Sequence, residues 1–375
     1  MKKKRSNFLK QKKIVYIHKS GRGWGGAQQK IFDLIEHFRN EFQEVVFICN
    51  SCMLLERIKK LKVKTYEIPI SSLKYSIITL MILAKILIRE KPDIIHSNHR
   101  YATLLVQILR SIFKLRYKIL HSARSVFTSK TSIRLLGDKI IAISLAVQKN
   151  LIEKFHILPE KIDVIYDGVK LNINSPIHLC QQNDPIYQLL DFSKKIIIGC
   201  FGSLVHAKGH EYLLQALADS PKAIQDKILV LIVGDGPLRK KLEAQTDKLN
   251  LRGIVKYLGY RDDAHHIMSY CHFLVIPSIQ DGLPNVLMEG YFLGKPSIAS
   301  ALDYVHEILV PNNISLLFPP KDFKKLAELI QIYVEKPELV IRHGMKGQPL
   351  FKRWFSLKKN LNSFRLAYQN LLELE

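Results

Sequence analysis

Glycine and proline are scarce in this sequence, and no repeat of fixed period occurs. Its 375 residues include 18 Gly and 15 Pro, too few for a fibrous or low-complexity chain. Hydrophobic residues make up 47% and charged residues 24%, which is typical of globular proteins. The length suggests two domains, with room for a third, and allows a core without disulfide bonds.

Cysteine is scarce as well. The five cysteines are odd in number and lie mostly in apolar runs, which fits a reducing cytosol. Cys49-x-x-Cys52 has the spacing of a redox or zinc motif, but no second Cys/His pair stands nearby to complete a metal site. We therefore expect a structural role for both thiols.

Long hydrophobic runs are absent. The longest, Ile77–Ile88, is interrupted by Lys85 and is too short to span a bilayer. The first apolar stretch, Ile14–Ile17, has only the length of a strand, so no signal peptide is predicted. We expect a cytoplasmic protein, either free or peripheral on the inner face of the cytoplasmic membrane.

Acidic side chains are few in the first two-fifths of the chain. Residues 1–150 carry 30 basic and 9 acidic side chains, whereas residues 151–375 carry 27 and 24. A basic excess confined to one half indicates a polyanion that this half meets, either nucleic acid or an anionic membrane surface. Ordinary solvated surface lysines are the alternative.

Strand-like and helix-like segments alternate along the whole chain, which predicts an α/β architecture of parallel sheets covered on both faces. The segment 172–194 is polar and turn-rich. We place a domain boundary there, and predict an N-terminal domain over 1–185, a C-terminal domain over 186–355 and an amphipathic tail helix over 356–375. The predicted strands are Ile14–Ile17, Val45–Ile48, Ile94–His96, Ile140–Ile143, Ile196–Phe201, Ile228–Val233 and Phe273–Ile276.

The residues after each strand are candidates for ligand binding, because open α/β sheets bind ligands at the carboxyl ends of their strands. Gly21, Gly23 and Gly26 match G-x-G-x-x-G, but Asn50 stands where a dinucleotide site needs an acid after the second strand. An NAD enzyme is thus disfavoured. The glycines, Gly25 included, would still let the backbone approach an anion at a helix N-terminus, unless they form only a tight turn.

Two histidines, His96 and His99, follow a strand of the first half. Such side chains can donate hydrogen bonds to a substrate or stabilise developing charge, although a structural role is an equal alternative.

The second half has three strand-to-helix loops of this kind. Gly202-Ser203 and Lys208-Gly209 predict a phosphate clamp made of one cation and backbone amides, with a solvated lysine as the alternative. Gly234 and Gly236 follow the next strand. The third loop leads into a helix with Glu289, so that two carboxylates eight residues apart can accept hydrogen bonds from sugar hydroxyls. That loop consists of Asp281, Gly282, Leu283, Pro284, Asn285 and Val286.

The third loop resembles the E-x7-E signature of glycosyltransferase family 4, the retaining nucleotide-sugar glycosyltransferases of GT-B fold. The resemblance covers nearly the whole chain, because further family motifs occur in the family's order. They are Gly25-Gly26-Ala27, the segments 140–147 and 164–169, Lys208-Gly209, 234–237, 282–285 and 294–296.

The resemblance implies two Rossmann-like domains that face a cleft, with the donor in the C-terminal domain, the acceptor in the N-terminal domain, and a tail helix that crosses back. Lys208 would bind the donor diphosphate, Glu289 the ribose and Asp281 the sugar. A histidine would lie beside the anomeric carbon; His96 and His99 are both candidates, and we favour His96. The implied donor-binding set is Gly25, Gly26, Gly202, Ser203, Lys208, Gly209, Gly234, Gly236, Asp281, Gly282, Leu283, Pro284, Asn285, Val286 and Glu289, and the implied catalytic set is His96, His99, Lys208 and Asp281.

Three residues depart from the family pattern. Asp281 replaces the usual Glu, which can alter the choice of donor sugar. Ser203 replaces an Arg, so its role would fall to another cation such as His206. Gln28 replaces a Glu of the glycine loop.

The implied reaction retains the anomeric configuration, and the leaving phosphate takes the acceptor's proton, while Lys208 and helix N-termini stabilise charge. No D-x-D motif and no Cys/His cluster is present, so we expect neither a cofactor nor an essential metal. The basic half predicts docking on anionic lipid, a lipid-linked glycan acceptor and a role in surface polysaccharide or lipopolysaccharide assembly, and no nucleic acid. The alternatives are a GT-B nucleotide-sugar epimerase and a non-enzymatic basic surface-binding protein.

Overall fold

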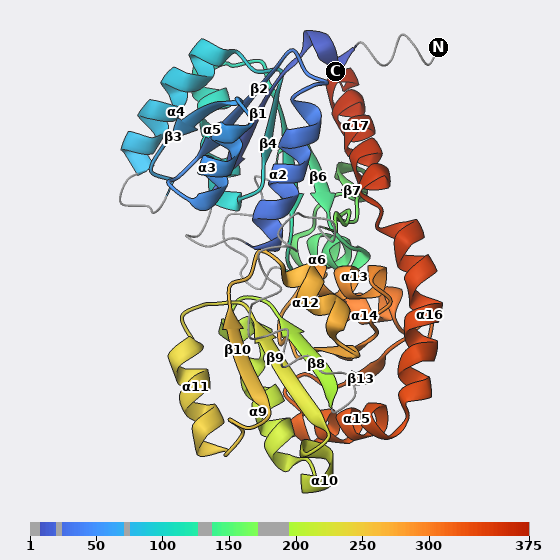
Figure 1. The fold of residues 1–375 in the computed structure, drawn as a ribbon. Helices are drawn as coiled ribbons and strands as arrows, with labels where there is room; N and C mark the ends of the chain where they lie inside the picture. Colours follow the sequence, from blue (N-terminus) through green and yellow to red (C-terminus); the bar gives the residue numbers. More distant parts are fainter. Residues whose placement is uncertain (1–7, 20–24, 71–75, 127–136, 172–194, 375) are drawn as a thin grey trace. The chain divides into compact units, whose positions relative to one another are not determined.

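The computed structural model describes residues 8–19, 25–70, 76–126, 137–171 and 195–374. These residues form two compact units, Met1–Gly168 with Leu357–Glu375 and Val169–Ser356 (Figure 1). The predicted boundary at residues 185 and 186 lies outside the described residues, as do Gly21 and Gly23. The packing itself changes from one unit to the other after Gly168.

The first unit is built on a seven-stranded parallel sheet with the order β3-β2-β1-β4-β5-β6-β7. The order reverses between β1 and β4, which is the topological switch point of a doubly wound sheet. The strands are β1 Lys13–His18, β2 Glu44–Cys49, β3 Lys64–Glu67, β4 Ile94–Ser97, β5 Lys118–Ala123, β6 Lys139–Ala142 and β7 Ile162–Val164.

Helices cover both faces of this sheet, because its strands are apolar on both sides. One face packs on α2, α3 and the tail helix α17, and the other packs on α4 and α5. The helices are α2 Gly26–Phe38, α3 Met53–Lys60, α4 Ser76–Glu90, α5 Arg100–Phe113, α6 Leu145–Phe155 and α17 Leu357–Glu373, with short 3-10 turns η1 Leu9–Gln11 and η4 Pro159–Lys161.

The second unit repeats this plan with a six-stranded parallel sheet in the order β10-β9-β8-β11-β12-β13, whose switch point lies between β8 and β11. Its strands are β8 Ile196–Phe201, β9 Ile228–Val233, β10 Val255–Gly259, β11 Phe273–Ile276, β12 Ser297–Ser300 and β13 Leu316–Phe318. Its helices are η5 His206–Lys208, α9 His210–Asp219, α10 Lys222–Gln225, α11 Arg239–Lys248, α12 Ala264–Tyr270, α13 Asn285–Phe292, α14 Asp303–Ile308, α15 Phe323–Glu335 and α16 Pro337–Trp354.

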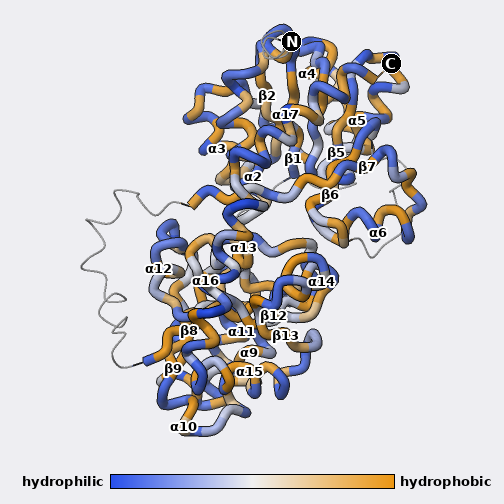
Figure 2. Tube along the Cα trace, turned by 90° about the vertical axis from the view of Figure 1, so that its right-hand side faces the viewer, coloured by the Kyte–Doolittle hydropathy of each residue, from blue (hydrophilic) through white to orange (hydrophobic). Residues whose placement is uncertain are grey.

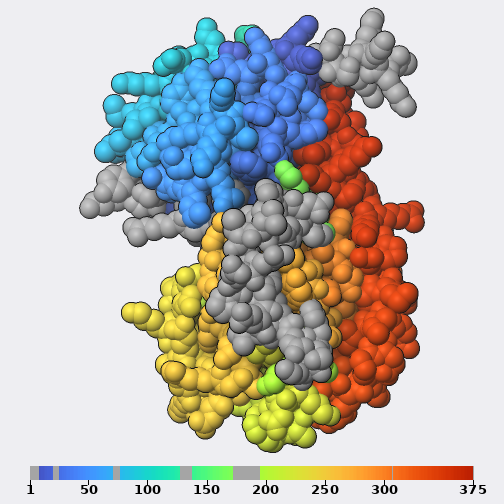
Figure 3. All heavy atoms as spheres, viewed as in Figure 1, coloured from blue at the N-terminus to red at the C-terminus, as the bar shows by residue number. Residues whose placement is uncertain are grey.

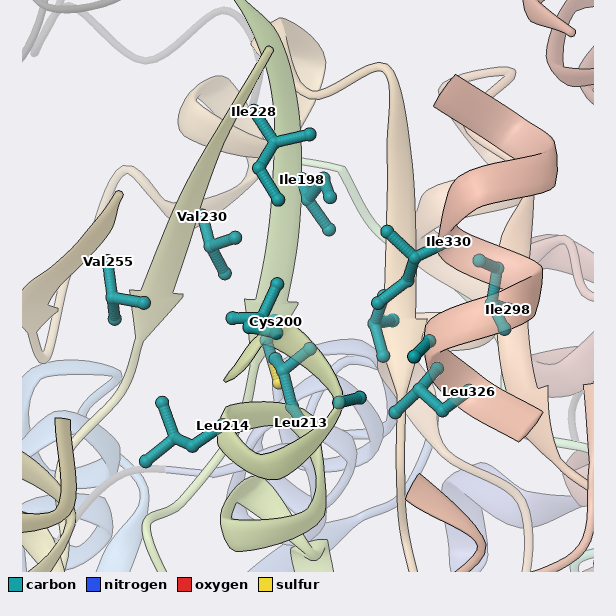
Figure 4. Close-up of a cluster of buried hydrophobic side chains, with 14 of the residues drawn as sticks. Ile198, Cys200, Leu213, Leu214, Ile228, Val230, Val255, Ile298, Leu326 and Ile330 are labelled. Atoms are coloured by element: carbon teal, nitrogen blue, oxygen red, sulfur yellow. The ribbon is translucent and has the colours of Figure 1, made fainter. Parts of the chain in front are cut away.

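The main core of the second unit lies between its sheet and helices α9 and α15. Ile198 and Val230 from the strands contact this layer together with Leu213 and Leu326 from the helices (Figure 4). All six residues of β9 are buried, and β8 and β9 are strongly hydrophobic in Figure 2. Continuous apolar strands of this kind are typical of a parallel sheet covered on both faces.

The tail helix α17 is part of the first unit although it comes last in the sequence. The Tyr368 hydroxyl lies 3.0 Å from the Tyr16 hydroxyl of β1 and 2.8 Å from Nδ1 of His96 in β4. Phe364 stacks on the His96 ring, with centroids 5.6 Å apart. These four residues are buried, and they fix the helix across the middle of the sheet.

The segment that leads out of the first unit is held from three sides. The buried Lys30 ammonium of α2 donates a hydrogen bond to the Gly168 carbonyl, and Asn360 of α17 donates one to the Tyr166 carbonyl at 2.6 Å. Arg124, after β5, forms a two-point ion pair with the buried carboxylate of Asp167. The backbone at the domain boundary is therefore tightly positioned.

Replacing Tyr368 with Phe tests this attachment. The variant keeps the ring but leaves the His96 Nδ1 and the Tyr16 hydroxyl without this partner in a buried site. We expect the free energy of unfolding to fall by about 1–3 kcal/mol in urea titrations. Tyr260→Phe is the matched control, because that hydroxyl lies on a surface loop with 41% of the side chain exposed, and a loss as large there would contradict the argument.

Candidate active site

Lys208 and Asp281 meet at the switch point of the second unit. Lys208 ends the turn η5 after β8, and Asp281 lies in the loop after β11. The Lys208 Nζ is 2.5 Å from Asp281 Oδ2. The lysine side chain is 30% exposed and the aspartate 15%, so the ion pair is reachable from one side.

The loop fixes the Asp281 carboxylate through further hydrogen bonds. Its Oδ1 accepts one from the Gly282 amide at 3.0 Å, and its Oδ2 is 3.5 Å from the Ser278 hydroxyl. A carboxylate can accept more hydrogen bonds than these. Capacity remains for a ligand hydroxyl.

Glycine is required at two positions in the loops at the carboxyl ends of the strands of the second unit. At Gly209 the backbone has φ +65°, and a Cβ there would lie 1.9 Å from the carbonyl oxygen of Pro277. At Gly234 the φ is +141°, and a Cβ would lie 2.0 Å from the Gly202 carbonyl oxygen. The loops that follow β8, β9 and β11 therefore approach one another more closely than side chains would allow.

Glu289 lies in the second turn of α13, which begins at Asn285 after Pro284. Its Oε2 is 3.5 Å from Nε2 of His265, at the start of α12. Both side chains are about four-fifths buried. Gly282, Leu283 and Pro284 are buried before the helix, whereas Asn285 and Val286 are partly exposed in its first turn.

A small pocket opens beside these residues. Lys208, Ser278, Pro284 and Val286 line it, together with the buried His210 of α9 and with Cys200, Phe201 and the segment 275–277. Neither His210 ring nitrogen has a hydrogen-bond partner within the described part of the chain. Burial lowers the pKa of His210 to about 4, so the ring is neutral near pH 7.

In the first unit, the predicted residues lie at the β1/β4 switch point. Gly25 precedes helix α2, and Gly26 is its first residue, as expected for a glycine loop at a helix N-terminus. Gln28 is in the first turn of the same helix.

The structure gives His96, the residue preferred as the histidine beside the substrate, no exposure to solvent. Its side chain is 0% exposed, and its two ring nitrogens contact Tyr368 and the Ser122 hydroxyl, each at 2.8 Å. Burial lowers its pKa to about 3. His96 is a neutral core residue that anchors the tail helix.

His99 is placed differently. It stands immediately before α5 and is partly exposed, and its buried Nδ1 has no partner among the residues described. Burial first, then the nearby charges of Lys19 and Arg100, lower its pKa to about 4. A neutral imidazole at the end of β4 can donate or accept a hydrogen bond.

Two family models match the chain. Glycosyltransferase Family 4 matches residues 24–173, and Glycosyl transferases group 1 matches residues 185–348. The chain belongs to glycosyltransferase family 4. It is a glycosyltransferase, and its two parallel-sheet units have the predicted GT-B fold.

Named relatives of this glycosyltransferase include two enzymes of Escherichia coli. It is 26% identical to the UDP-Gal:alpha-D-GlcNAc-diphosphoundecaprenol alpha-1,3-galactosyltransferase, over 74% of this chain and 76% of the relative. It is 26% identical to the lipopolysaccharide glucosyltransferase WaaG of strain K12, over 68% of this chain and 65% of the relative. Its fold is similar to that of Anabaena HepE in complex with UDP-glucose, with a TM-score of 0.82 and 21% identity over 96% of this chain and all of that one.

The structure shows the surroundings of the residues that depart from the family pattern. Ser203 is exposed, and the nearby His206 is 67% exposed and lies 3.1 Å from the Glu211 carboxylate. His206 is thus close enough in the chain to supply a cation, but an acid already pairs with it. Asp281, shorter than the usual Glu, reaches Lys208 directly.

Sequence reasoning missed two residues of the site, His265 and His210, and a third residue, Tyr304, that feels the charge of Asp281. Tyr304 is fully buried, and its hydroxyl has no partner in the described ranges. Burial, and to a lesser degree the charge of Asp281, raise its pKa well above the usual value. No motif contains these residues, and only the sheet order brings His265 to Glu289.

Two features are absent from the described residues. No described helix is both long enough and apolar enough to cross a bilayer. Within the same residues, no three His, Cys, Asp or Glu side chains group together as metal ligands would.

Gly209→Ala tests the close packing of the loops. We expect a loss of roughly 1–3 kcal/mol in the stability of the second unit, because the methyl group meets the Pro277 carbonyl and the residue must keep a positive φ. Thermal unfolding measures it. Gly253→Ala is the control, since a Cβ at Gly253 meets nothing within 4 Å, and equal losses in the two variants would refute the packing argument.

The first unit should lose stability in mild acid. Burial lowers the pKa of His18, His96 and His121 to about 3 in the folded chain, while the unfolded value is near 6.5. The folded state therefore stays neutral while the unfolded state takes up protons. The contribution of these neutral histidines to the free energy of unfolding is complete above pH 6.5. Below that pH it falls by about 1.4 kcal/mol per histidine for each pH unit. Urea titrations between pH 7 and 5 measure the slope, and a flat profile would contradict it.

Proposed function

We propose that this glycosyltransferase moves a sugar from a UDP-linked donor to a lipid-linked or glycan acceptor, with retention of the anomeric configuration, in cell-surface polysaccharide or lipopolysaccharide assembly. The observation that carries the proposal is the contact of Lys208 with Asp281 at the β8/β11 switch point. A cation and an acid that touch one another suit two adjacent groups of one ligand. In a nucleotide sugar, the diphosphate adjoins the sugar hydroxyls.

The charges suggest a division of roles. Lys208 would bind the diphosphate as a point charge and stabilise it as it leaves. Asp281, released from part of its contact with Lys208, would accept hydrogen bonds from the sugar. The amides around Gly282 and the start of α13 would add dipoles aimed at negative charge.

Glu289 would hold the ribose. Its carboxylate lies four residues into α13 and contacts His265 at 3.5 Å. The histidine limits the rotation of the carboxylate, and a carboxylate has enough acceptors for both ribose hydroxyls. Uracil is proposed as the base because one named relative is described with UDP-Gal and the HepE complex contains UDP-glucose.

The proposed chemistry needs no protein base. The leaving phosphate would take the acceptor's proton on the same face of the sugar, which keeps the configuration. His99, neutral at pH 7, would orient a hydroxyl through a hydrogen bond. No essential metal is proposed, because Lys208 and helix dipoles would supply the positive charge.

The acceptor is inferred from the relatives and from charge. One relative is named for a diphosphoundecaprenol acceptor and the other for lipopolysaccharide. The 30 basic side chains of residues 1–150 suit an enzyme that acts at the surface of an anionic membrane.

Lys208→Met tests the donor site. We expect affinity for UDP to fall about 10- to 100-fold in calorimetric titrations, because a charge-assisted phosphate contact is lost. Lys324→Met, an exposed lysine of α15, is the matched control. Equal affinities in the wild type and the Lys208 variant would refute the assigned role.

The same titration with GDP, ADP, CMP and NAD identifies the base, and Glu289→Ala should lose the preference for a ribonucleotide. NMR of the product formed from a UDP-sugar identifies its anomer, and the anomer decides between retention and inversion. Turnover that survives EDTA is expected. Release of the sugar without any acceptor would instead favour an epimerase.

A further inference from the structure

The outer face of α4 has an unusual composition. Its exposed side chains are apolar or basic, and none is acidic. They are Ile77, Ile78, Met81, Lys85, Ile88 and Arg89. A helix on a protein surface normally presents polar and charged residues of both signs to water.

The side chains on the inner face of α4 make the contacts that hold this helix on the sheet. Leu83, Ala84, Ile86 and Leu87 are buried against the sheet in one cluster with Val15. The outer residues are not needed there, since Ile77 is 75% exposed and Met81 is 59% exposed. An apolar stripe of this kind marks an interaction site.

The end of α5 continues the same surface. Ile112 is 64% exposed and Phe113 is 48% exposed, and the exposed Lys114 and Arg116 follow them. Helices α4 and α5 cover the same face of the sheet and pack on each other. Both follow parallel strands, so their carboxyl ends lie at one edge of the sheet. Figures 1 and 3 show this part of the chain, in light blue to cyan, on the outside of the unit.

The charge of this surface favours one kind of binding partner over another. The one acid at the end of α4, Glu90, is 3% exposed and pairs with Lys64 at 2.7 Å. Glu90 also lies 3.8 Å from the Arg89 guanidinium, so one buried acid faces two cations. The surface therefore combines apolar side chains with an excess of positive charge. A second copy of the chain would bring like charge against like, because the formal net charge is +24. An anionic lipid bilayer offers both acidic headgroups and an apolar interior.

We propose that the outer face of α4, with the end of α5, docks on an anionic membrane by inserting its apolar side chains between the lipids while Lys85, Arg89, Lys114 and Arg116 contact the headgroups. The helix would lie in the plane of the interface, since 15 residues are too few to span the bilayer. This inference deepens the proposed function, because it rests on a lipid-linked acceptor.

Vesicle pelleting tests the proposal without any turnover. The full chain should bind vesicles of phosphatidylcholine mixed with phosphatidylglycerol, and bind phosphatidylcholine alone much less. Ile77→Ser/Met81→Ser should weaken binding about tenfold or more, through lost apolar burial. Lys85→Gln/Arg89→Gln should weaken it roughly 25-fold, at about fivefold per charge, and should reduce its sensitivity to salt.

Ile341→Ser/Met345→Ser is the matched control, the same residue pair at the same spacing on α16 of the second unit, 62% and 72% exposed. Unchanged thermal unfolding shows that the variants fold. Equal losses in the two serine variants, or no binding by the wild type, would overturn the proposal. Dimers that dissociate only in the α4 variant would overturn it in favour of a second copy. UDP titration of the same samples reports on the donor site separately, so either proposal can fail alone.

Discussion

Parallel pairing of the strands within each sheet determines where chemistry can occur in this glycosyltransferase. Parallel strands place every following loop at one edge, and the reversal of strand order separates two neighbouring loops. In the second unit that reversal lies between β8 and β11. Lys208 and Asp281, 73 residues apart in the sequence, follow these two strands and so become direct neighbours.

Much of this arrangement could be predicted from the sequence because each part has a local signal. Apolar runs predicted β8, β9 and β11, and glycines after them predicted loops that approach a ligand. The ion pair itself has no local signal. It depends on which strands are adjacent, and apolar runs such as Ile196–Phe201 and Ile228–Val233 look alike in the sequence. The contact of His265 with Glu289 was missed for the same reason.

His96 shows a different limit. The predicted strand ends at His96, and β4 continues one residue further, to Ser97, so His96 lies within the sheet and only His99 lies beyond it. The face of the sheet on which a strand residue lies decides its partners. For His96 the partners come from a helix more than 260 residues later, as the Tyr368 contact shows. No local sequence pattern predicts such a contact. Helix α4 is a related case, because an apolar segment does not reveal which of its residues remain exposed.

The attachment of the tail helix also bears on how the chain is made. A ribosome synthesises the sheet of the first unit before the second unit, but Tyr368 and Phe364 emerge only after it. The second unit, Val169–Ser356, is continuous in the sequence and complete before them. It can fold during synthesis, whereas β1 and β4 must wait with one flank of their sheet uncovered. The N-terminal half of the protein is then the last to reach its final structure, and a chain truncated before residue 357 would expose that apolar flank.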